Sequence, residues 1–159
     1  MKLFLDTTYF LALLNLHNSL TPPDFLNSLR VNDKFEELYY SSITIFELQA
    51  LGAKRIIKQK ITKSDVIKGI QSLLLSPNLI QVSTQSSLIT DMALELRGLH
   101  QDFIDCLILS SAALSSDILI SEDAKINKLS NEPIFLRILS GFSKTKFKVM
   151  TSNQISSMF

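Results

Sequence analysis

Several residues on which common enzyme motifs depend are scarce in this sequence. It contains one cysteine, two histidines, four glycines and no tryptophan among its 159 residues. The single Cys106 rules out an internal disulfide framework and a cysteine-rich zinc site, and it fits a reducing compartment. No CxxC, HExxH or GxSxG motif and no glycine-rich phosphate loop is present. The sequence therefore offers no motif that competes with its acidic side chains as the source of chemistry.

A dominant charge and long apolar runs are also lacking. The net charge of +1 argues neither for nor against a polyanionic partner. The N-terminal stretch MKLFLDTTYFLALLNLHN superficially resembles a signal peptide, but Asp6 interrupts it and no small-residue cleavage pattern follows. No other apolar stretch approaches the roughly 20 residues of a bilayer span. We expect a soluble, cytoplasmic protein that does not bind membranes.

The composition and patterning that are present predict a packed α/β domain. Hydrophobic residues make up 46% of the chain and charged residues 19%, which favours one globular domain over residues 1–159. Short apolar segments predict strands, and longer periodic or capped segments between them predict helices. The strands are expected at 2–6, 38–41, 79–82, 117–121 and 146–150, and the main helices at 9–16, 44–58, 63–75, 87–97 and 102–114. Helices between short apolar strands indicate a single α/β domain with a short, mostly parallel central sheet of about five strands flanked by helices.

Two other segments are interpreted as helical. The stretch TPPDFLNSLR places Pro22 and Pro23 where a helix's first turn tolerates them. The stretch NEPIFLRILSGFSK, residues 131–144, is expected to form either one more core helix, which we favour, or an added helix for a dimer or partner contact. The apolar residues Tyr9, Phe10 and Leu13 likewise have two interpretations, a homodimer surface or ordinary core packing.

Asp6 and Asp123 each follow an apolar predicted strand. In open α/β sheets, ligands gather outside the carboxyl ends of the strands, so both acids are well placed to meet one. The alternative for each is a helix N-cap, because Asp is among the best capping residues. For Asp6, the hydroxyls of Thr7 and Thr8 are expected to orient the carboxylate. Glu122, beside Asp123, is expected to point to solvent.

Glu47 and Asp105 are expected near the starts of helices. Thr44 and Glu47 have the spacing of a capping box, which explains Glu47 as well as a functional role does. Asp102 is expected to be an N-cap, and Asp105, three residues later on the same face, to project into a cleft. The alternative for Asp105 is compensation of the helix dipole, which is worth only about 0.3–1 kcal/mol.

Acidic residues that are dispersed in sequence but converge in space provide what hard divalent cations require. The sequence therefore predicts a site for Mg²⁺ or Mn²⁺ built from four acids, Asp6, Glu47, Asp105 and Asp123. Four carboxylates packed together repel one another, so we expect some of them to have raised pKa values without metal.

These motifs, taken in order, resemble those of the PIN-domain ribonucleases, including the toxin-type, VapC-like members. LDTTYFLALL resembles the opening strand, acid, hydroxyl and helix of that family, and SSITIFELQAL resembles its second acidic element. FIDCLILSSAAL resembles the third-acid helix, and ILISEDAKI the fourth element, with Ser121 where Thr is commoner. KVMTSNQISSMF resembles the closing strand and short helix, so the likeness spans essentially the whole chain.

The resemblance implies a PIN-like fold and metal-dependent hydrolysis of RNA phosphodiester bonds. Asp6, Glu47, Asp105 and Asp123 would be the metal ligands and catalytic residues, with Asp6 and Asp123 bridging. The supporting residues would be Thr7, Ser121 and Asp102, and Asp102 is an alternative to Asp105 as the third ligand. The family also implies an RNA substrate, commonly a homodimer, and an antitoxin protein as partner where the member is a toxin.

Substrate contacts and other functions stay open. Two basic runs are candidates for phosphate binding or simply for solvated surface: Lys54, Arg55, Lys58, Lys60 and Lys63, and Lys144, Lys146 and Lys148. His17 and His100 have no partner at ligand spacing and are expected to be ordinary polar residues. The alternative functions are a catalytically silent binding module and a haloacid-dehalogenase-type phosphatase, which LDTT suggests but ILISED matches poorly.

Overall fold

The fold is a five-stranded, fully parallel sheet with helices packed on both faces. The computed structural model describes residues 1–16, 21–22, 24–30 and 34–158. The strand order is β3-β2-β1-β4-β5, and every neighbouring pair runs parallel. The strands are β1 (Lys2–Leu5), β2 (Glu37–Ser41), β3 (Leu79–Val82), β4 (Ile118–Ile120) and β5 (Lys148–Met150). The predicted α/β class and the five-stranded parallel sheet are confirmed.

The helices lie close to the ranges expected from the sequence. They are η1 (Thr7–Leu14), α1 (Phe25–Arg30), α2 (Ser42–Ile57), α3 (Lys63–Leu74), α4 (Ser87–Leu96), α5 (Phe103–Ser115), α6 (Ala124–Leu129), α7 (Pro133–Gly141) and α8 (Ser152–Ser156). The first of them is a 3-10 helix and begins two residues earlier than predicted. Pro22 precedes α1 instead of lying in its first turn, while Pro23 and His17 fall outside the described residues.

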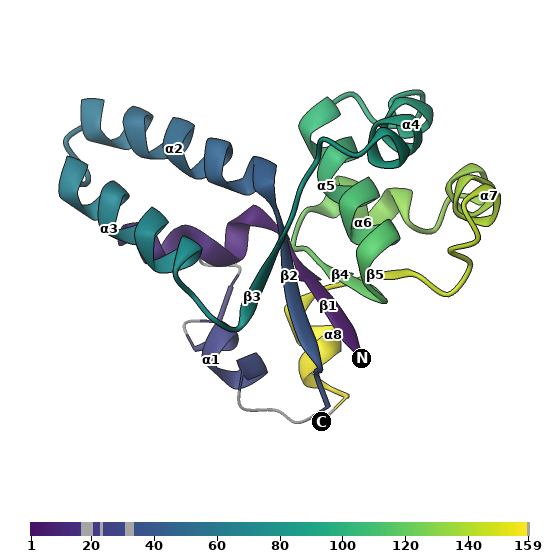
Figure 1. Ribbon diagram of the computed structural model, residues 1–159, viewed down its shortest axis with the longest axis horizontal. Helices are drawn as coiled ribbons and strands as arrows, with labels where there is room; N and C mark the ends of the chain where they lie inside the picture. Colours follow the sequence, from purple (N-terminus) through teal and green to yellow (C-terminus); the bar gives the residue numbers. More distant parts are fainter. Residues whose placement is uncertain (17–20, 23, 31–33, 159) are drawn as a thin grey trace.

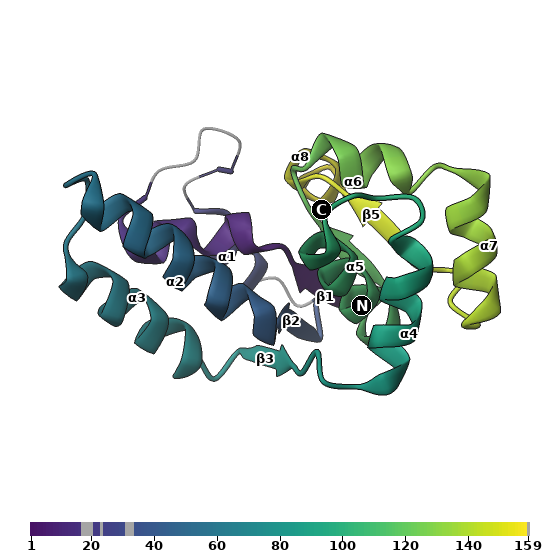
Figure 2. The ribbon, with the colours of Figure 1, turned by 90° about the horizontal axis from the view of Figure 1, so that it is seen from above.

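Each face of the sheet contributes to its own hydrophobic core, because successive side chains of a strand point to opposite faces. Leu3 and Leu5 of β1 pack with η1, α1, α2 and α3 on one face. Phe4, between them in sequence, packs with α4, α5, α6 and α7 on the other. Figure 1 shows these two groups of helices on opposite sides of the sheet, and Figure 2 shows the same division from above.

The two ambiguous apolar segments contribute mainly to these cores. Tyr9 and Phe10 are buried, so they are core residues and the predicted homodimer surface does not include them. Helix α7 inserts Phe135 and Leu139 into the second core, which supports its interpretation as a core helix. Within the described ranges, no helix combines the length and apolar composition that crossing a bilayer requires.

The hairpin formed by α2 and α3 reaches beyond the edge of the sheet (Figure 1). Helix α3 lies directly against η1 because Gly69 has no side chain. A Cβ at this position would stand 2.4 Å from the carbonyl oxygen of Leu13, far inside van der Waals contact. The close approach of these helices therefore requires glycine at position 69.

Candidate active site

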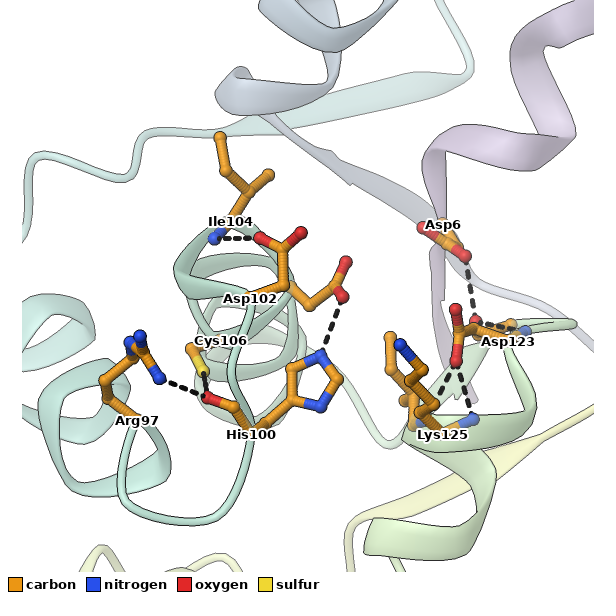
Figure 3. A network of polar contacts seen from close by, with 11 residues as sticks. Asp6, Arg97, His100, Asp102, Ile104, Cys106, Asp123 and Lys125 are labelled. Atoms are coloured by element: carbon orange, nitrogen blue, oxygen red, sulfur yellow. Dashed lines mark hydrogen bonds and ion pairs between the residues drawn. The ribbon is translucent and has the colours of Figure 1, made fainter.

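The acids that follow β1 and β4 lie side by side, because these two strands are neighbours and end at the same edge of the sheet. Asp6 follows β1, and the hydroxyl of Ser121, directly after β4, donates to its Oδ2 at 2.8 Å. The same Ser121 oxygen accepts the backbone N–H of Asp123 at 3.1 Å. Ser121 thus connects the two acids, and Figure 3 shows Asp6 facing the loop that holds Asp123.

Asp6 is both a helix cap and a buried acid. Its Oδ1 accepts the N–H of Thr7 at 2.7 Å, so it forms the N-cap of η1, and its side chain is 7% exposed. Burial raises its pKa to about 6, and the charges of Asp105 and Asp123 act in the same direction. The hydrogen bonds from Ser121 and Thr7 oppose this shift. A capping role alone does not require a carboxylate to be removed from water in this way.

Glu47 reaches the same region from the second turn of α2. Its Oε2 accepts the hydroxyl of Thr7, which also lies 3.1 Å from the hydroxyl of Thr44. The predicted capping box is wrong, because Ser41 caps α2 and Thr44 is a buried residue inside the helix. Burial raises the pKa of Glu47 to about 7, and the charges of nearby acids, Asp6 first among them, add to the effect.

Asp102 and Asp105 enter the site from the start of α5. Asp102 is the N-cap, as predicted, and its Oδ1 accepts the N–H of Ile104 at 2.9 Å. Asp105 lies with its Oδ2 2.7 Å from Nε2 of His100, a contact that the sequence spacing of these two residues did not indicate. Burial raises the pKa of Asp105, the hydrogen bond from His100 opposes this, and the charges of Asp102 and Asp123 add to it.

Asp123 and Glu122 accept hydrogen bonds from different parts of the fold. Oδ1 of Asp123 accepts the N–H groups of Lys125 at 2.6 Å and Ile126 at 3.1 Å, so Asp123 caps α6. Glu122 does not point to solvent as predicted. Its Oε1 accepts the hydroxyl of Tyr9 and the N–H of Ser152, both at 2.7 Å, and it connects η1 to the start of α8.

The predicted acids thus face one region, although each is held by its own partner. Among the residues that the structure describes, no three acidic, histidine or cysteine side chains are grouped tightly enough to hold one metal ion as placed. In the same set, no lysine or arginine forms an ion pair with Asp6, Glu47, Asp105 or Asp123. Buried carboxylates without a cation carry an unfavourable charge, and oxygen donors suit Mg²⁺ or Mn²⁺. The donor set therefore fits a hard divalent cation, with side-chain rotation needed to close the shell.

The two basic runs lie away from these acids. The first is at the end of α2 and the start of α3, on the tip of the hairpin that extends from the sheet (Figure 1). In the second, Lys144 donates to the carbonyl of Leu114 at 2.9 Å, and Lys148 begins β5 at the amino edge of the sheet. Because the acids lie at the carboxyl edge, the interpretation of both runs as structural or solvated surface is favoured.

Three contacts in this region were missed by sequence reasoning, those of Thr44, His100 and Glu122. Thr44 carried a misleading signal, since its spacing to Glu47 fits a capping box. His100 pairs with a residue only five positions later, but across a turn and a helix start, where no regular spacing applies. Glu122 pairs with Tyr9, which is 113 residues away, and no local pattern signals such a contact.

Comparisons with known proteins agree with this geometry. The family model described as PIN domain matches residues 3–132. No curated protein sequence matches the chain. A solved structure with a similar fold is the crystal structure of VapBC2 from Rickettsia felis bound to a DNA fragment from their promoter. The matching chain is 23% identical with a TM-score of 0.58, and the alignment covers 95% of this chain and 98% of that one. With its parallel sheet and acids at the carboxyl edge, the chain belongs to the PIN domain family, whose members are generally nucleases.

Proposed function

We propose that this protein is a divalent-metal-dependent endoribonuclease that hydrolyses RNA phosphodiester bonds with Mg²⁺ or Mn²⁺. The observation that carries this proposal is the set of partly buried carboxylates at the carboxyl edge of the sheet. They raise one another's pKa values, and none of them has a lysine or arginine partner among the described residues. Membership of the PIN domain family supports it and argues against the phosphatase alternative.

Asp6, Glu47, Asp105 and Asp123 would hold the cation. When bound, the ion supplies positive charge to the scissile phosphate and acidifies a water molecule. This assignment uses oxygen donors only, as Mg²⁺ and Mn²⁺ prefer. Asp102 is the N-cap of α5 and is exposed, so it is assigned a supporting role.

The remaining residues of the site position these carboxylates. Thr7 holds Glu47, Ser121 holds Asp6, and His100 holds Asp105. With a pKa of about 7, Glu47 keeps a proton on a substantial fraction of molecules near neutral pH. A cation that binds there must displace this proton, so its affinity should fall as the pH falls.

The entire chain is proposed to act as one nuclease unit, although the family match ends at residue 132. The segment that follows contributes β5, which pairs with β4, and Ile155 of α8, which is fully buried in the first core. Its removal would therefore expose both the sheet and the core. The lone buried Cys106 is compatible with action in the reducing cytoplasm.

We further propose that the protein is the toxin of a toxin–antitoxin pair, with an antitoxin protein as partner and a homodimer as its own assembly. The support is the likeness to a chain of the VapBC2 structure over nearly the full length of both. Induced expression should arrest bacterial growth in the wild-type form and not as Asp6→Asn. Growth unaffected by an active wild-type enzyme would favour an RNA-processing role instead.

The nuclease proposal is tested by incubating a structured RNA with purified protein in Mn²⁺, in EDTA, and as Asp6→Asn with Mn²⁺. Cleavage is expected only by the wild type in Mn²⁺. Asp91→Asn is the matched control, because Asp91 is exposed on α4 and the same charge is removed away from the site. Equal cleavage by Asp6→Asn and Asp91→Asn would refute the assignment. No cleavage, together with absent Mn²⁺ binding in calorimetry, would favour the silent binding module.

A further inference from the structure

A cavity of about 720 Å³ opens between the start of α5, α6 and α7. Its volume is within the range of sites that take a small organic molecule, about 300–1,000 Å³. Its lining includes Asp102 and His100, and His100 contacts Asp105 directly. The cavity therefore adjoins the carboxylate site, and most of its lining residues have no role in the proposed hydrolysis.

Two lysines of the lining have no partner of their own. Lys125 and Lys128 are both exposed on α6, and neither ammonium makes a hydrogen bond or ion pair within the part of the chain that the structure describes. Lys144, by contrast, donates to a backbone carbonyl. Figure 3 shows Lys125 on the α6 side of the gap, with His100 and Asp102 on the opposite side. Lys125 is thus a free cation at the border between the cavity and the acids.

The rest of the lining combines apolar, acidic and other polar side chains, His100 and Gln101 among the last. Phe103 at the start of α5 is 36% exposed, and Leu129 and Ile134 add aliphatic surface. Asp102 and Glu132 also line the cavity, so two carboxylates balance the two ammonium groups. This balance disfavours a simple anion. A ligand that presents a phosphate to the lysines and an aromatic ring to Phe103 would use both the charged and the apolar parts of the lining.

The wall that holds His100 is fixed by its own contacts. The guanidinium of Arg97 donates to the carbonyl of His100 at 3.2 Å, and the thiol of Cys106 lies 3.7 Å from the same oxygen. Both contacts appear in Figure 3. The loop between α4 and α5 is therefore held in place before any ligand enters, which reduces the entropic cost of binding.

We propose that this cavity binds one unstacked nucleotide of a single-stranded RNA, next to the bond that is cut. Lys125 and Lys128 contact its phosphates, and Phe103 stacks on its base. The proposal rests on the nuclease function and names residues that would hold the substrate beside the carboxylates. A base inside a duplex is stacked and paired and cannot enter such a cavity, so the nucleotide bound there must be unpaired.

Binding of a labelled single-stranded RNA in EDTA, followed by fluorescence anisotropy over a range of salt concentrations, tests the lysines without requiring cleavage. The double variant Lys125→Gln/Lys128→Gln should lower the slope of log affinity against log salt by about 1.4, since each single-strand phosphate contact contributes about 0.7. Between 50 and 200 mM salt, the ratio of the wild-type affinity to the affinity of the double variant should then fall about sevenfold. Lys58→Gln/Lys60→Gln removes the same charge at the hairpin tip and should leave the slope unchanged. Equal slopes for both double variants would overturn the proposal.

The aromatic contact has a separate test. Phe103→Leu keeps an apolar side chain on the surface but removes the ring, and it should weaken RNA binding about fivefold or more. Photo-crosslinking of an RNA that carries 4-thiouridine should label Phe103 or its neighbours. Crosslinks confined to α2 and α3, or equal binding of Phe103→Leu and wild type, would refute the stacking role. Binding of adenosine 5′-monophosphate as tight as that of the RNA would also overturn the proposal, in favour of a free-nucleotide site.

These outcomes are independent of the test of hydrolysis. If the slope and crosslinks are as expected but Asp6→Asn still cleaves RNA, the carboxylate assignment fails and the nucleotide site stands. If cleavage requires Asp6 but the lysine and Phe103 variants bind like wild type, the nucleotide site fails and the nuclease assignment stands.

Discussion

Removing the charge of Asp6 should stabilise the metal-free protein at neutral and alkaline pH. Burial raises the pKa of this acid from 3.8 to about 6, so the folded state holds its proton more tightly than the unfolded chain does. The stability contributed by this proton is complete below about pH 4 and is lost as the pH rises through about 6. One pH unit corresponds to about 1.4 kcal/mol, and the difference of about 2 units gives about 3 kcal/mol.

Asn is close in shape to protonated Asp and carries no charge, so Asp6→Asn should recover up to about 3 kcal/mol at pH 8 and almost nothing at pH 4. Urea unfolding followed by far-ultraviolet circular dichroism, with EDTA throughout, measures this difference at both pH values. Asp91→Asn serves as the control, because it removes the same charge from an exposed position on α4. An Asp6→Asn protein that is no more stable than wild type at pH 8 would refute the inference that the charged form of Asp6 destabilises the folded state.

Other predictions concern one acid and two packing contacts. Wild-type stability should fall as the pH rises from 4.5 to about 7, because the folded state holds the proton of Glu47 more tightly than the unfolded chain does, and Glu47→Gln should remove this part of the fall. The same unfolding series measures it, and a fall of equal size in both proteins would contradict the prediction. Gly69→Ala should destabilise the fold by about 2 kcal/mol or more, because the added Cβ meets a main-chain carbonyl of η1, whereas Gly141→Ala, with open space around it, should not lower the melting temperature. Tyr9→Phe should cost about 1–3 kcal/mol, because it leaves Glu122 without one of its two donors, and an unchanged unfolding midpoint would show that Glu122 needs only the other.

The sheet could be predicted from the sequence because each strand is a short apolar run closed by a polar residue. The run that ends at Asp6 and the run that ends at Ser121 both carried that signal, and a parallel arrangement then places their ends at one edge. The length of the first helix was also evident, but its 3-10 geometry was not. Apolar periodicity does not separate an α-helix from a 3-10 helix over eight residues.

The site could be predicted only in part from the sequence. Its acids could be named because each lies at the end of a strand or the start of a helix. The partners that hold them could not, because Thr7 and Glu47 are 40 residues apart and Ser121 and Asp6 are 115 apart. Such pairs depend on which strands are neighbours, and a single sequence does not specify that order.

The two separate cores have a consequence for how this protein loses function. Glu47 is carried by a helix that packs on one face of the sheet, whereas Asp105 is carried by a helix that packs on the other. A partial unfolding event that releases either layer would therefore separate the carboxylates even though the opposite layer stays folded. Activity should accordingly disappear at the first subglobal opening detected by native-state hydrogen exchange, below the denaturant concentration of global unfolding. Loss of activity would thus report a loosening of the contacts between the two helix layers and the sheet that they share.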